Sequence, residues 1–565
     1  MPHHPVSETA VSAPGKVLLT GGYLVLDRAY TGTVFALNAR IHVVVRQLRR
    51  EKRRREERVT RAARRGDEEE EGRGGGGGGR VEDGAGEEGR GGDGKGEDKV
   101  EDGGVGKGPG EGDGDADGGR GEEEEVIVVK SPQFVDAVWE YGVRREPDGG
   151  GVRVVQKGDC PRNPFVETSL NYALTYISYV AASKLFGSLS ITILADNDYY
   201  SQTSISQAAG ANRGTRFVNF GVKLHEAHKT GLGSSAALVT ALVSAMVIHR
   251  TVQPEELPTV RDKLHNLAQA AHCAAQGKVG SGFDVGAAVY GSCLYRRFSP
   301  AVLGSLGDVG SPQFEERLFA VVEDLNTEHP WDTECVDFGT KLPRGMQMVL
   351  CDVDCGSQTP GMVKKVLQWR EENREEANAL WAELQQNNEK LRLLLKDLLY
   401  HTNSTSRTTT AVSSSPSSAS AGNSTNISSI NDDDDDDDDD NDGNNFDAVS
   451  RLISRSRALL RTMTQKSAVP IEPRVQTELL DRLSAEVEGV IGGVVPGAGG
   501  YDAIALLVRD DAAVVDRLRG FLRTWKSSVE DDFGGKIERV RLLGVAHGSE
   551  GLRNEIPAQY SGWMS

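Results

Sequence analysis

A glycine-rich segment in the middle of the chain has the composition of a phosphate-binding loop. It reads Gly231-Leu-Gly-Ser-Ser-Ala-Ala237 and runs directly into a strongly apolar stretch, 236–249. Glycines permit a tight turn, and the free amides and positive dipole end of a following helix attract phosphate. The hydroxyls of Ser234 and Ser235 are suited to contact a phosphate oxygen or a magnesium ion. Because no lysine follows the second glycine, this is not a Walker loop.

Three more glycine-rich segments lie at wide separations along the chain. They are Ser12-Ala-Pro-Gly-Lys-Val-Leu-Leu-Thr-Gly-Gly22, Gly280-Ser-Gly-Phe-Asp-Val-Gly286 and Pro496-Gly-Ala-Gly-Gly-Tyr-Asp502. The first carries Lys16 and the second Asp284, and a lysine can stabilise the charge that develops in phosphoryl transfer. Taken alone, Lys16 is typical of a surface lysine and Asp284 of a turn or helix cap. His272 is more typical of a histidine packed within a helix than of a catalyst.

The elements around these segments mix helices and strands. Strand-like runs cover 11–26, 35–48, 126–130, 189–194, 348–353 and 503–508. Helical spacing covers 163–186, 236–249, 264–275, 361–400, 446–465 and 475–490. Because strands and helices do not alternate regularly, we expect an α+β fold rather than a doubly wound one.

Two long tracts have too few apolar residues to form a core. The segment 49–125 consists almost wholly of Arg, Glu, Asp and Gly, and 401–445 is rich in Ser, Thr and Asn around the run Asp432–Asp440. We expect both to be disordered insertions, the first in an overgrown hairpin loop, because so little apolar surface does not offset the entropy of ordering the chain. They carry −8 and −9 of the net charge of −19, so the remaining body is almost neutral.

Several classes of protein do not fit the sequence. The six cysteines have no Cys-x-x-Cys spacing, which favours reduced thiols over a metal site. Residues 1–16 contain no apolar leader segment, and the longest apolar run, 236–248, is shorter than the roughly 20 residues that span a bilayer. The basic run 49–65 lacks interleaved aromatic residues and is typical of a solvated loop. We expect a cytoplasmic protein without nucleic-acid or membrane partners.

The glycine-rich segments together resemble the motifs of a known enzyme family. The Pro-Gly-Lys start, the Gly-Leu-Gly-Ser-Ser-Ala loop and the Gly-Ala-Gly-Gly element occur in the order found in the GHMP kinases. Within that family, several further stretches resemble phosphomevalonate kinases of the fungal type. They are Gly21-Gly-Tyr-Leu-Val-Leu26, Ala271-His-Cys-Ala-Ala-Gln-Gly-Lys-Val-Gly-Ser-Gly-Phe-Asp284, Tyr290-Gly-Ser292 and Thr359-Pro-Gly-Met-Val-Lys-Lys365.

This resemblance implies a fold and a reaction. The expected fold has an N-terminal domain like part of ribosomal protein S5, residues 1–340, and a ferredoxin-like C-terminal domain, residues 341–565. The active site is expected in the cleft between them. The expected reaction is the phosphorylation of 5-phosphomevalonate by ATP with Mg²⁺, in the mevalonate pathway to isoprenoids and sterols such as ergosterol. The resemblance leaves the oligomeric state open.

The resemblance also implies roles for individual residues. Asp284 matches the catalytic aspartate of the family, and Lys16 matches the lysine that contacts this aspartate and the substrate. Ser235 matches the serine that contacts magnesium. The expected ATP-binding residues are Lys229, Thr230, Gly231, Leu232, Gly233, Ser234, Ser235 and Ala236. The expected substrate-binding residues are Lys16, Lys278, Ser281 and Gly499.

One position departs from the pattern of the related mevalonate kinases. Those enzymes carry a metal-binding glutamate eleven residues before the catalytic aspartate, where this chain has Cys273. Gln276 or a water molecule would then take that place, with magnesium held largely by ATP phosphates and water.

The expected acceptor is itself a phosphate, which is mostly dianionic at pH 7. Asp284 is therefore expected to fix the geometry of Lys16 and of the nucleophile more than to remove a proton. Two phosphate-bearing reactants repel each other, so the acceptor pocket needs additional cations. The candidates are Lys229, Lys278 and Lys364 or Lys365.

Three alternatives remain open at this point. The first is a mevalonate kinase or another small-molecule kinase on the same fold. The second is a catalytically inactive regulator with this fold, which would be expected to have lost Lys16 or Asp284. The third is an interaction scaffold built around the acidic tracts.

Overall fold

The computed structural model describes residues 8–48, 125–181, 186–201, 216–337, 341–354, 361–408, 437–530 and 534–564. The predicted insertion 49–125 lies outside these residues except at Glu125. The prediction of disorder there stays untested. The description below concerns the rest of the chain.

The larger of two sheets is mixed and has ten strands within the described residues. Its strands are β1 (Glu8–Thr20), β2 (Gly32–Gln47), β3 (Val126–Lys130), β4 (Val138–Arg145), β5 (Val152–Lys157), β6 (Leu189–Ala195), β7 (Cys293–Arg296), β8 (Glu334–Val336), β13 (His547–Gly548) and β14 (Arg553–Glu555). Seven of them follow the order β14-β1-β2-β6-β3-β4-β5. The strands β7 and β13 pair with β2, and β8 pairs with β7. β3 and β6 pair in parallel.

The place of β6 corrects one sequence prediction. The tract 49–125 was predicted to extend a hairpin between two neighbouring strands, but β6 lies between β2 and β3 and pairs with both. Every residue of β6 is buried. Both faces of this strand are covered, because Ile191 and Ile193 face the main core and Ser190 and Thr192 are buried on the other face. The next strand in sequence, β3, therefore does not pair with β2, and the later strand β6 pairs with both.

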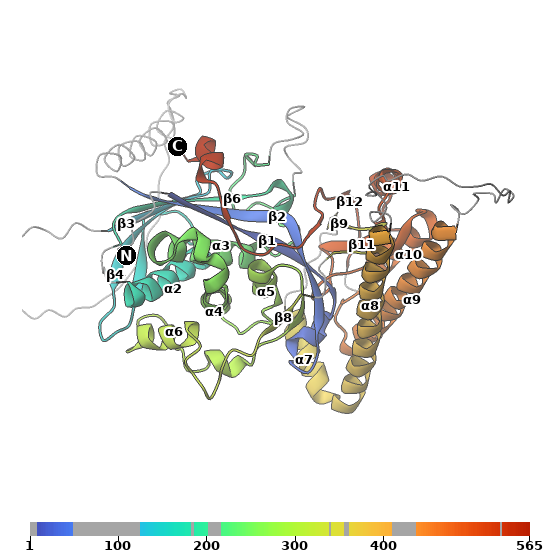
Figure 1. Ribbon diagram of the computed structural model, residues 1–565, viewed down its shortest axis with the longest axis horizontal. Coiled ribbons are helices and arrows are strands. Elements are labelled where there is room, and N and C mark those ends of the chain that lie inside the picture. Colours follow the sequence, from blue (N-terminus) through green and yellow to red (C-terminus); the bar gives the residue numbers. More distant parts are fainter. Residues whose placement is uncertain are drawn as a thin grey trace, which may run out of the picture. The chain divides into compact units, whose positions relative to one another are not determined.

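Helices cover one face of the larger sheet (Figure 1). They are α2 (Pro164–Val180), α3 (Ser234–Thr251), α4 (Leu257–Gln276), α5 (Phe283–Tyr290) and α6 (Phe314–Val322). Alternate strand residues separate the two faces, since Val43 and Val45 belong to the main core whereas Val44 packs with Tyr560 on the other side. Short 3-10 helices complete this part of the fold: η1 (Gly22–Leu26), η2 (Asn197–Tyr199), η3 (Pro254–Glu256), η4 (Pro300–Leu303) and η5 (Pro557–Trp563).

The central helix α3 is buried along most of its length. Within the described residues it is the one helix long and apolar enough to cross a membrane, and 72% of it is buried inside the protein. Such burial is the pattern of a core helix. The sheet and the neighbouring helices, which contact α3 on several sides, account for its apolar sequence.

The smaller sheet has the order β10-β11-β9-β12 and is antiparallel throughout. Its strands are β9 (Met346–Asp354), β10 (Val490–Val494), β11 (Ala503–Arg509) and β12 (Arg539–Leu542). Helix α10 (Arg474–Glu486) precedes β10, and α11 (Ala512–Thr524) joins β11 to β12. This βαββαβ succession, with its first and third strands at the centre, is the ferredoxin-like arrangement. The predicted α+β fold with two kinds of sheet is confirmed.

Three helices extend from the smaller sheet: α7 (Met362–Glu372), α8 (Arg374–Thr408) and α9 (Asp437–Ser467). The sequence predicted a single helix over 361–400, but the chain breaks at Asn373, whose φ and ψ are −127° and 47°. The side-chain amide of Asn373 donates to the carbonyl of Trp369 at 3.0 Å and so caps the end of α7. The predicted insertion 401–445 is helical at both ends, through Thr408 and from Asp437.

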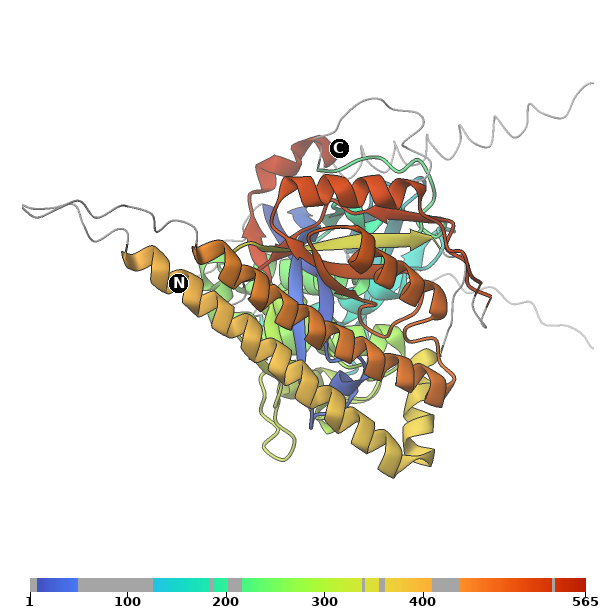
Figure 2. The same ribbon diagram turned by 90° about the vertical axis from the view of Figure 1, so that its right-hand side faces the viewer.

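The long helices α8 and α9 lie side by side (Figures 1 and 2). A buried polar contact fixes their register, because Asn387 donates to the hydroxyl of Ser456 and to the carbonyl of Leu452, both at 2.8 Å. After β12 the chain returns to the larger sheet, where β14 pairs with β1. The division into domains 1–340 and 341–565 stays a prediction.

Candidate functional site

The predicted phosphate loop forms a tight turn at the start of α3. Gly231 and Gly233 adopt left-handed backbone angles, with φ of +74° and +82°, and Gly233 is the N-cap residue of α3. Leu232 between them is buried in the main core and anchors the turn. The first turn of α3, which begins at Ser234, therefore places its free N–H groups and positive dipole end at this loop. This local geometry suits a phosphate group.

Lys16 on β1 lies across the loop. Its backbone N–H donates to the carbonyl of Leu232 at 2.9 Å, and its Nζ donates to the carbonyl of Gly231 at 3.4 Å. A Cβ atom placed on Gly233 would lie 2.8 Å from Lys16 Cε. The stem of the lysine thus runs directly over this glycine, and its amino group is held beside the loop.

Asp284 is the acidic group that acts on Lys16. Burial lowers the pKa of Lys16 from its ordinary value, and the negative charge of Asp284 opposes this shift. The amino group also lies 5.5 Å from the centre of the Phe283 ring, the residue before Asp284. The first turn of α5 therefore faces Lys16. Two residues from separate sequence motifs meet here.

The position of Asp284 depends on the glycine turn that precedes α5. Gly282 is the N-cap of α5, with φ of +82°, and a Cβ atom there would lie 2.6 Å from the hydroxyl oxygen of Tyr295. No larger residue fits without movement of the turn. Asp284 Oδ1 accepts a hydrogen bond from the N–H of Val285 at 3.0 Å. Its Oδ2 lies 3.9 Å from Nε2 of His272.

The third glycine cluster also reaches this region. The hydroxyl of Tyr23 donates to the carbonyl of Ala498 at 2.8 Å and ties η1 to the Gly497–Gly500 turn. A Cβ atom on Gly499 would lie 2.1 Å from the carbonyl oxygen of Ile471, so only glycine fits at this position. The same segment ends at Asp502, and a Cβ atom placed on Gly231 would lie 3.8 Å from the Cβ of Asp502. The four glycine-rich segments therefore gather around one loop.

The remaining predicted residues lie around this loop with different exposures. Thr230 is fully buried, and its hydroxyl donates to the carbonyl of Asp198 at 2.6 Å, so it holds the loop from behind. Lys229 is exposed and pairs through its backbone with Tyr200. The carbonyl of Ser281 accepts a hydrogen bond from Tyr295 at 2.7 Å. The predicted acceptor-side cations Lys278, Lys364 and Lys365 are exposed.

The sequence reasoning missed Arg297 and interpreted His272 as a histidine packed within a helix, and the structure places both beside the candidate site. Arg297 donates to the carbonyl of Gly280 at 2.8 Å and to that of Leu26 at 2.5 Å, and so ties the turn before α5 to η1. His272 lies between Ser235 and Asp284. The position of His272 one turn before the end of α4, within the stretch that resembles the family, was the available signal. Nothing in the sequence around Arg297 indicated its role.

The residues at the site fit a magnesium ion held mainly by other groups. Ser235 and Asp284 supply oxygen atoms, the donor type that Mg²⁺ prefers. Cys273 does not replace the glutamate of mevalonate kinases, because it is buried and desolvation raises the pKa of its thiol. Among the described residues, no group of three His, Cys, Asp or Glu side chains could hold a metal by itself. ATP phosphates and water would supply most of the ligands.

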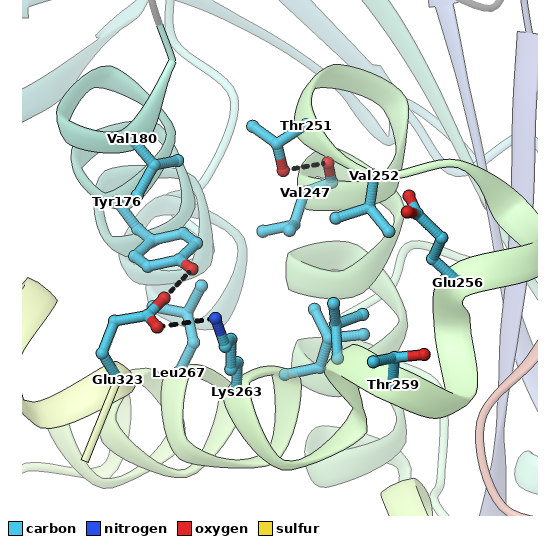
Figure 3. Close-up of a pocket in the computed structure, with 12 residues that line it drawn as sticks. Tyr176, Val180, Val247, Thr251, Val252, Glu256, Thr259, Lys263, Leu267 and Glu323 are labelled. Atoms are coloured by element: carbon cyan, nitrogen blue, oxygen red, sulfur yellow. Dashed lines mark hydrogen bonds and ion pairs between the residues drawn. The ribbon is translucent and has the colours of Figure 1, made fainter. Parts of the chain in front are cut away.

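A separate cavity of about 350 Å³ lies between the C-terminal end of α3 and the N-terminal half of α4 (Figure 3). Tyr176 and Lys263 both contact Glu323 along one of its walls, at 2.7 and 2.6 Å. Its lining includes Val247 and Thr251 near the end of α3, whereas the phosphate loop adjoins the first residue of that helix. A helix of 18 residues is about 27 Å long. The cavity is therefore distinct from the phosphate loop.

The gathered glycine-rich segments, Lys16 and Asp284 have the arrangement expected of a GHMP kinase. The family described as GHMP kinases N terminal domain matches residues 205–292. Phosphomevalonate kinase erg8 of Aspergillus fumigatus is 60% identical over 560 residues, which cover 99% of both chains. Phosphomevalonate kinase ERG8 of Gibberella zeae is 40% identical over 566 residues, 98% of both chains. The chain belongs to the phosphomevalonate kinases of the GHMP kinase family.

A solved structure is consistent with this assignment at the level of the fold. The Lin0012 protein of Listeria innocua matches 95% of this chain and 99% of its own, with a TM-score of 0.50 and 14% identity.

Proposed function

We propose that this protein transfers the terminal phosphoryl group of ATP to the phosphate of (R)-5-phosphomevalonate, giving (R)-5-diphosphomevalonate and ADP. The observation that carries the proposal is the meeting of Lys16, Asp284 and the phosphate loop in one place. Family membership supports the choice of acceptor. The reaction would take place in the mevalonate pathway to isoprenoids and sterols such as ergosterol, in the cytoplasm.

The phosphate loop would bind the nucleotide. The backbone amides at the start of α3 would hold the ATP phosphates, and Gly231 and Gly233 let the backbone approach them closely. Thr230 and Leu232 would act from behind by fixing the loop. Ser235 would contact the magnesium ion, which supplies charge neutralisation on the phosphates when it is bound.

Lys16 would stabilise the charge that develops between donor and acceptor. Its amino group is confined by β1 and by the glycine beneath it, so little reorganisation is needed during the reaction. Asp284 favours the protonated form of this lysine, against the effect of burial. The acceptor phosphate is mostly dianionic at neutral pH and attacks without losing a proton to the enzyme. Asp284 would therefore act mainly by orienting Lys16 and the acceptor.

The acceptor would lie against the turn before α5 and the third glycine cluster. Ser281 and Gly499 belong to these two segments, and Lys278 lies just before the first of them. Lys229, Lys278 and Lys364 or Lys365 remain candidates for the cations that offset repulsion between the two phosphate-bearing reactants. Their exposed amino groups are free to move toward a bound anion.

The deciding experiment is a coupled ADP-release assay with purified protein. Phosphomevalonate and mevalonate are compared as acceptors at equal ATP and Mg²⁺ concentrations. We expect turnover with phosphomevalonate and very little with mevalonate. Equal use of both acceptors would overturn the proposed substrate, and no turnover with either would overturn the proposed enzyme activity.

A further inference from the structure

His272 is enclosed by the active-site elements and barely reaches solvent. It lies near the end of α4, with 3% of its side chain exposed. Its Nε2 atom lies 3.3 Å from the hydroxyl oxygen of Ser235 and 3.9 Å from Oδ2 of Asp284. The amide nitrogen of Gln276, one turn later on α4, lies 3.2 Å from the same atom. The Phe165 ring of α2 lies near the imidazole, with the ring centres 6.0 Å apart.

A single imidazole nitrogen thus faces side chains from two different motifs. Ser235 belongs to the first turn of α3, and Asp284 belongs to the first turn of α5. These helices meet near the phosphate loop, but each side chain has rotational freedom of its own. A buried ring between them limits that freedom, because Nε2 lies within hydrogen-bond distance of the Ser235 hydroxyl and the ring occupies the space beside the Asp284 carboxylate. Residues that orient metal-contacting side chains, the role proposed for Ser235, commonly affect activity by 10- to 100-fold.

The neighbour of His272 on α4 explains why this residue takes the position. Successive helix residues point about 100° apart, so His272 and Cys273 face different surroundings. Cys273 accepts a hydrogen bond from Gln269 at 3.2 Å within the helix and is buried. His272 instead points to the phosphate loop. This helix therefore places an imidazole beside Ser235, whereas Cys273 stays in the protein interior.

We propose that His272 is a positioning residue, which holds the hydroxyl of Ser235 and the carboxylate of Asp284 in a fixed relation through Nε2. The Phe165 ring packs near the imidazole and helps to keep it in place for this task. The position of the Ser235 hydroxyl on the nucleotide side is thereby coupled to the position of the Asp284 carboxylate on the acceptor side. The inference rests on the proposed function, because it assigns the two oriented groups to phosphoryl transfer.

The test exploits the different lengths of glutamine and asparagine. In His272→Gln the side-chain amide takes the place of Nε2, whereas in His272→Asn it takes the place of Nδ1. We expect His272→Gln to retain kcat within about fivefold of the wild type. We expect His272→Asn to lose roughly 10- to 100-fold in kcat, with the KM for ATP and for the acceptor within about threefold. Equal kcat in the two variants would overturn the proposal.

His265 supplies the matched control. It lies two turns earlier on α4, is 1% exposed, and contacts Asn266 rather than the site. We expect His265→Gln and His265→Asn to change thermal stability and to have similar kcat values. If kcat differed between the two His265 variants as much as between the two His272 variants, the effect would be one of packing. That result would overturn the assignment.

A spectroscopic measurement keeps the inference independent of activity. In protein with ¹⁵N-labelled histidine, the His272 ring signal is assigned by its loss in His272→Gln. We expect this signal to shift in Ser235→Ala and in Asp284→Asn, without nucleotide or acceptor present. A signal that stays unchanged in both variants would overturn the contact on which the proposal rests. If the wild-type protein lacked turnover while the signal shifted, the proposed function would fail and the contact would stand.

Discussion

The stem of Lys16 runs over Gly233, such that a Cβ atom on this glycine would lie 2.8 Å from Lys16 Cε and 3.2 Å from Lys16 Cγ. The glycine is therefore needed for two reasons. Its φ of +82° suits a residue without a side chain, and the space above it is already filled by the side chain of Lys16. The phosphate loop and Lys16 can be placed correctly only together.

Gly233→Ala should consequently lower activity by more than its cost in stability accounts for. We expect kcat to fall roughly 100-fold, because displacement of a preorganised charge typically has an effect of this size. Gly277→Ala is the matched control. Gly277 has a φ of +65°, and none of the described residues lies within 4 Å of its Cβ position. Both variants should lose about 1–2 kcal/mol of unfolding free energy, and only Gly233→Ala should lose kcat. Similar kcat in the two would contradict the role of the Lys16 contact.

Removing either charge at the centre of the site should abolish most of the turnover. We expect Lys16→Ala and Asp284→Asn to fold normally and each to lose roughly 10²-fold or more in kcat. Circular dichroism and thermal unfolding verify that the fold is retained. Near-normal kcat in either folded variant would show that the residue is not part of the catalytic machinery.

The titration of Lys16 should set the alkaline limit of activity. Burial lowers its pKa below 10.5, so the lysine loses its proton, and the enzyme its activity, at a lower pH than an exposed lysine would. Between the folded-state pKa and 10.5, the unfolded chain binds more protons at this position. Lys16 therefore destabilises the fold less as the pH rises through this window. In Lys16→Arg the alkaline fall in kcat/KM should move to higher pH, since arginine keeps its charge. An unmoved alkaline limb would assign it to another group.

Recognition of the acceptor phosphate should produce a strong substrate preference. A site with cations and donors arranged for a dianion leaves them unpaired when mevalonate binds, at a cost of roughly 2–5 kcal/mol. This corresponds to about 30- to 5000-fold in kcat/KM in favour of phosphomevalonate. Neutralising Lys278 or Lys229 should shrink the preference if that lysine contacts the acceptor. If it contacts the nucleotide, the KM for ATP should rise instead.

The hydrogen bond from Tyr23 to Ala498 should contribute to stability. Tyr23→Phe removes the hydroxyl and leaves the carbonyl of Ala498 unpaired, so we expect a loss of about 1 kcal/mol of unfolding free energy. Tyr141 is the control, because it is fully buried and its hydroxyl has no hydrogen-bond partner among the described residues. Tyr141→Phe should be neutral or slightly stabilising in urea unfolding. An equal loss in both variants would mean that the Tyr23 bond is not what stabilises the fold.

Part of the fold followed from local patterns. The apolar run after Gly233 predicted α3, and the mixture of helical and strand periods predicted an α+β fold, because these periods reflect which side chains face the core. Strand order did not follow. The place of β6 between β2 and β3 depends on pairing between segments far apart in the chain, which local periodicity does not encode. The sequence pattern also did not predict the break at Asn373, because the helical period continues on both sides.

For the site, the sequence by itself determined the chemistry that is available: a phosphate loop at Gly231 and Gly233, a lysine at position 16 and a carboxylate at position 284. These residues are recognisable because glycine turns and helix starts are local features. Only the tertiary structure decided which side chains meet. His272 reaches the site because α4 packs against α3 and α5, and Arg297 because the residue after β7 contacts η1. Such contacts depend on the orientation of whole elements in space. A residue that acts by orienting another side chain is not marked by a sequence motif of its own.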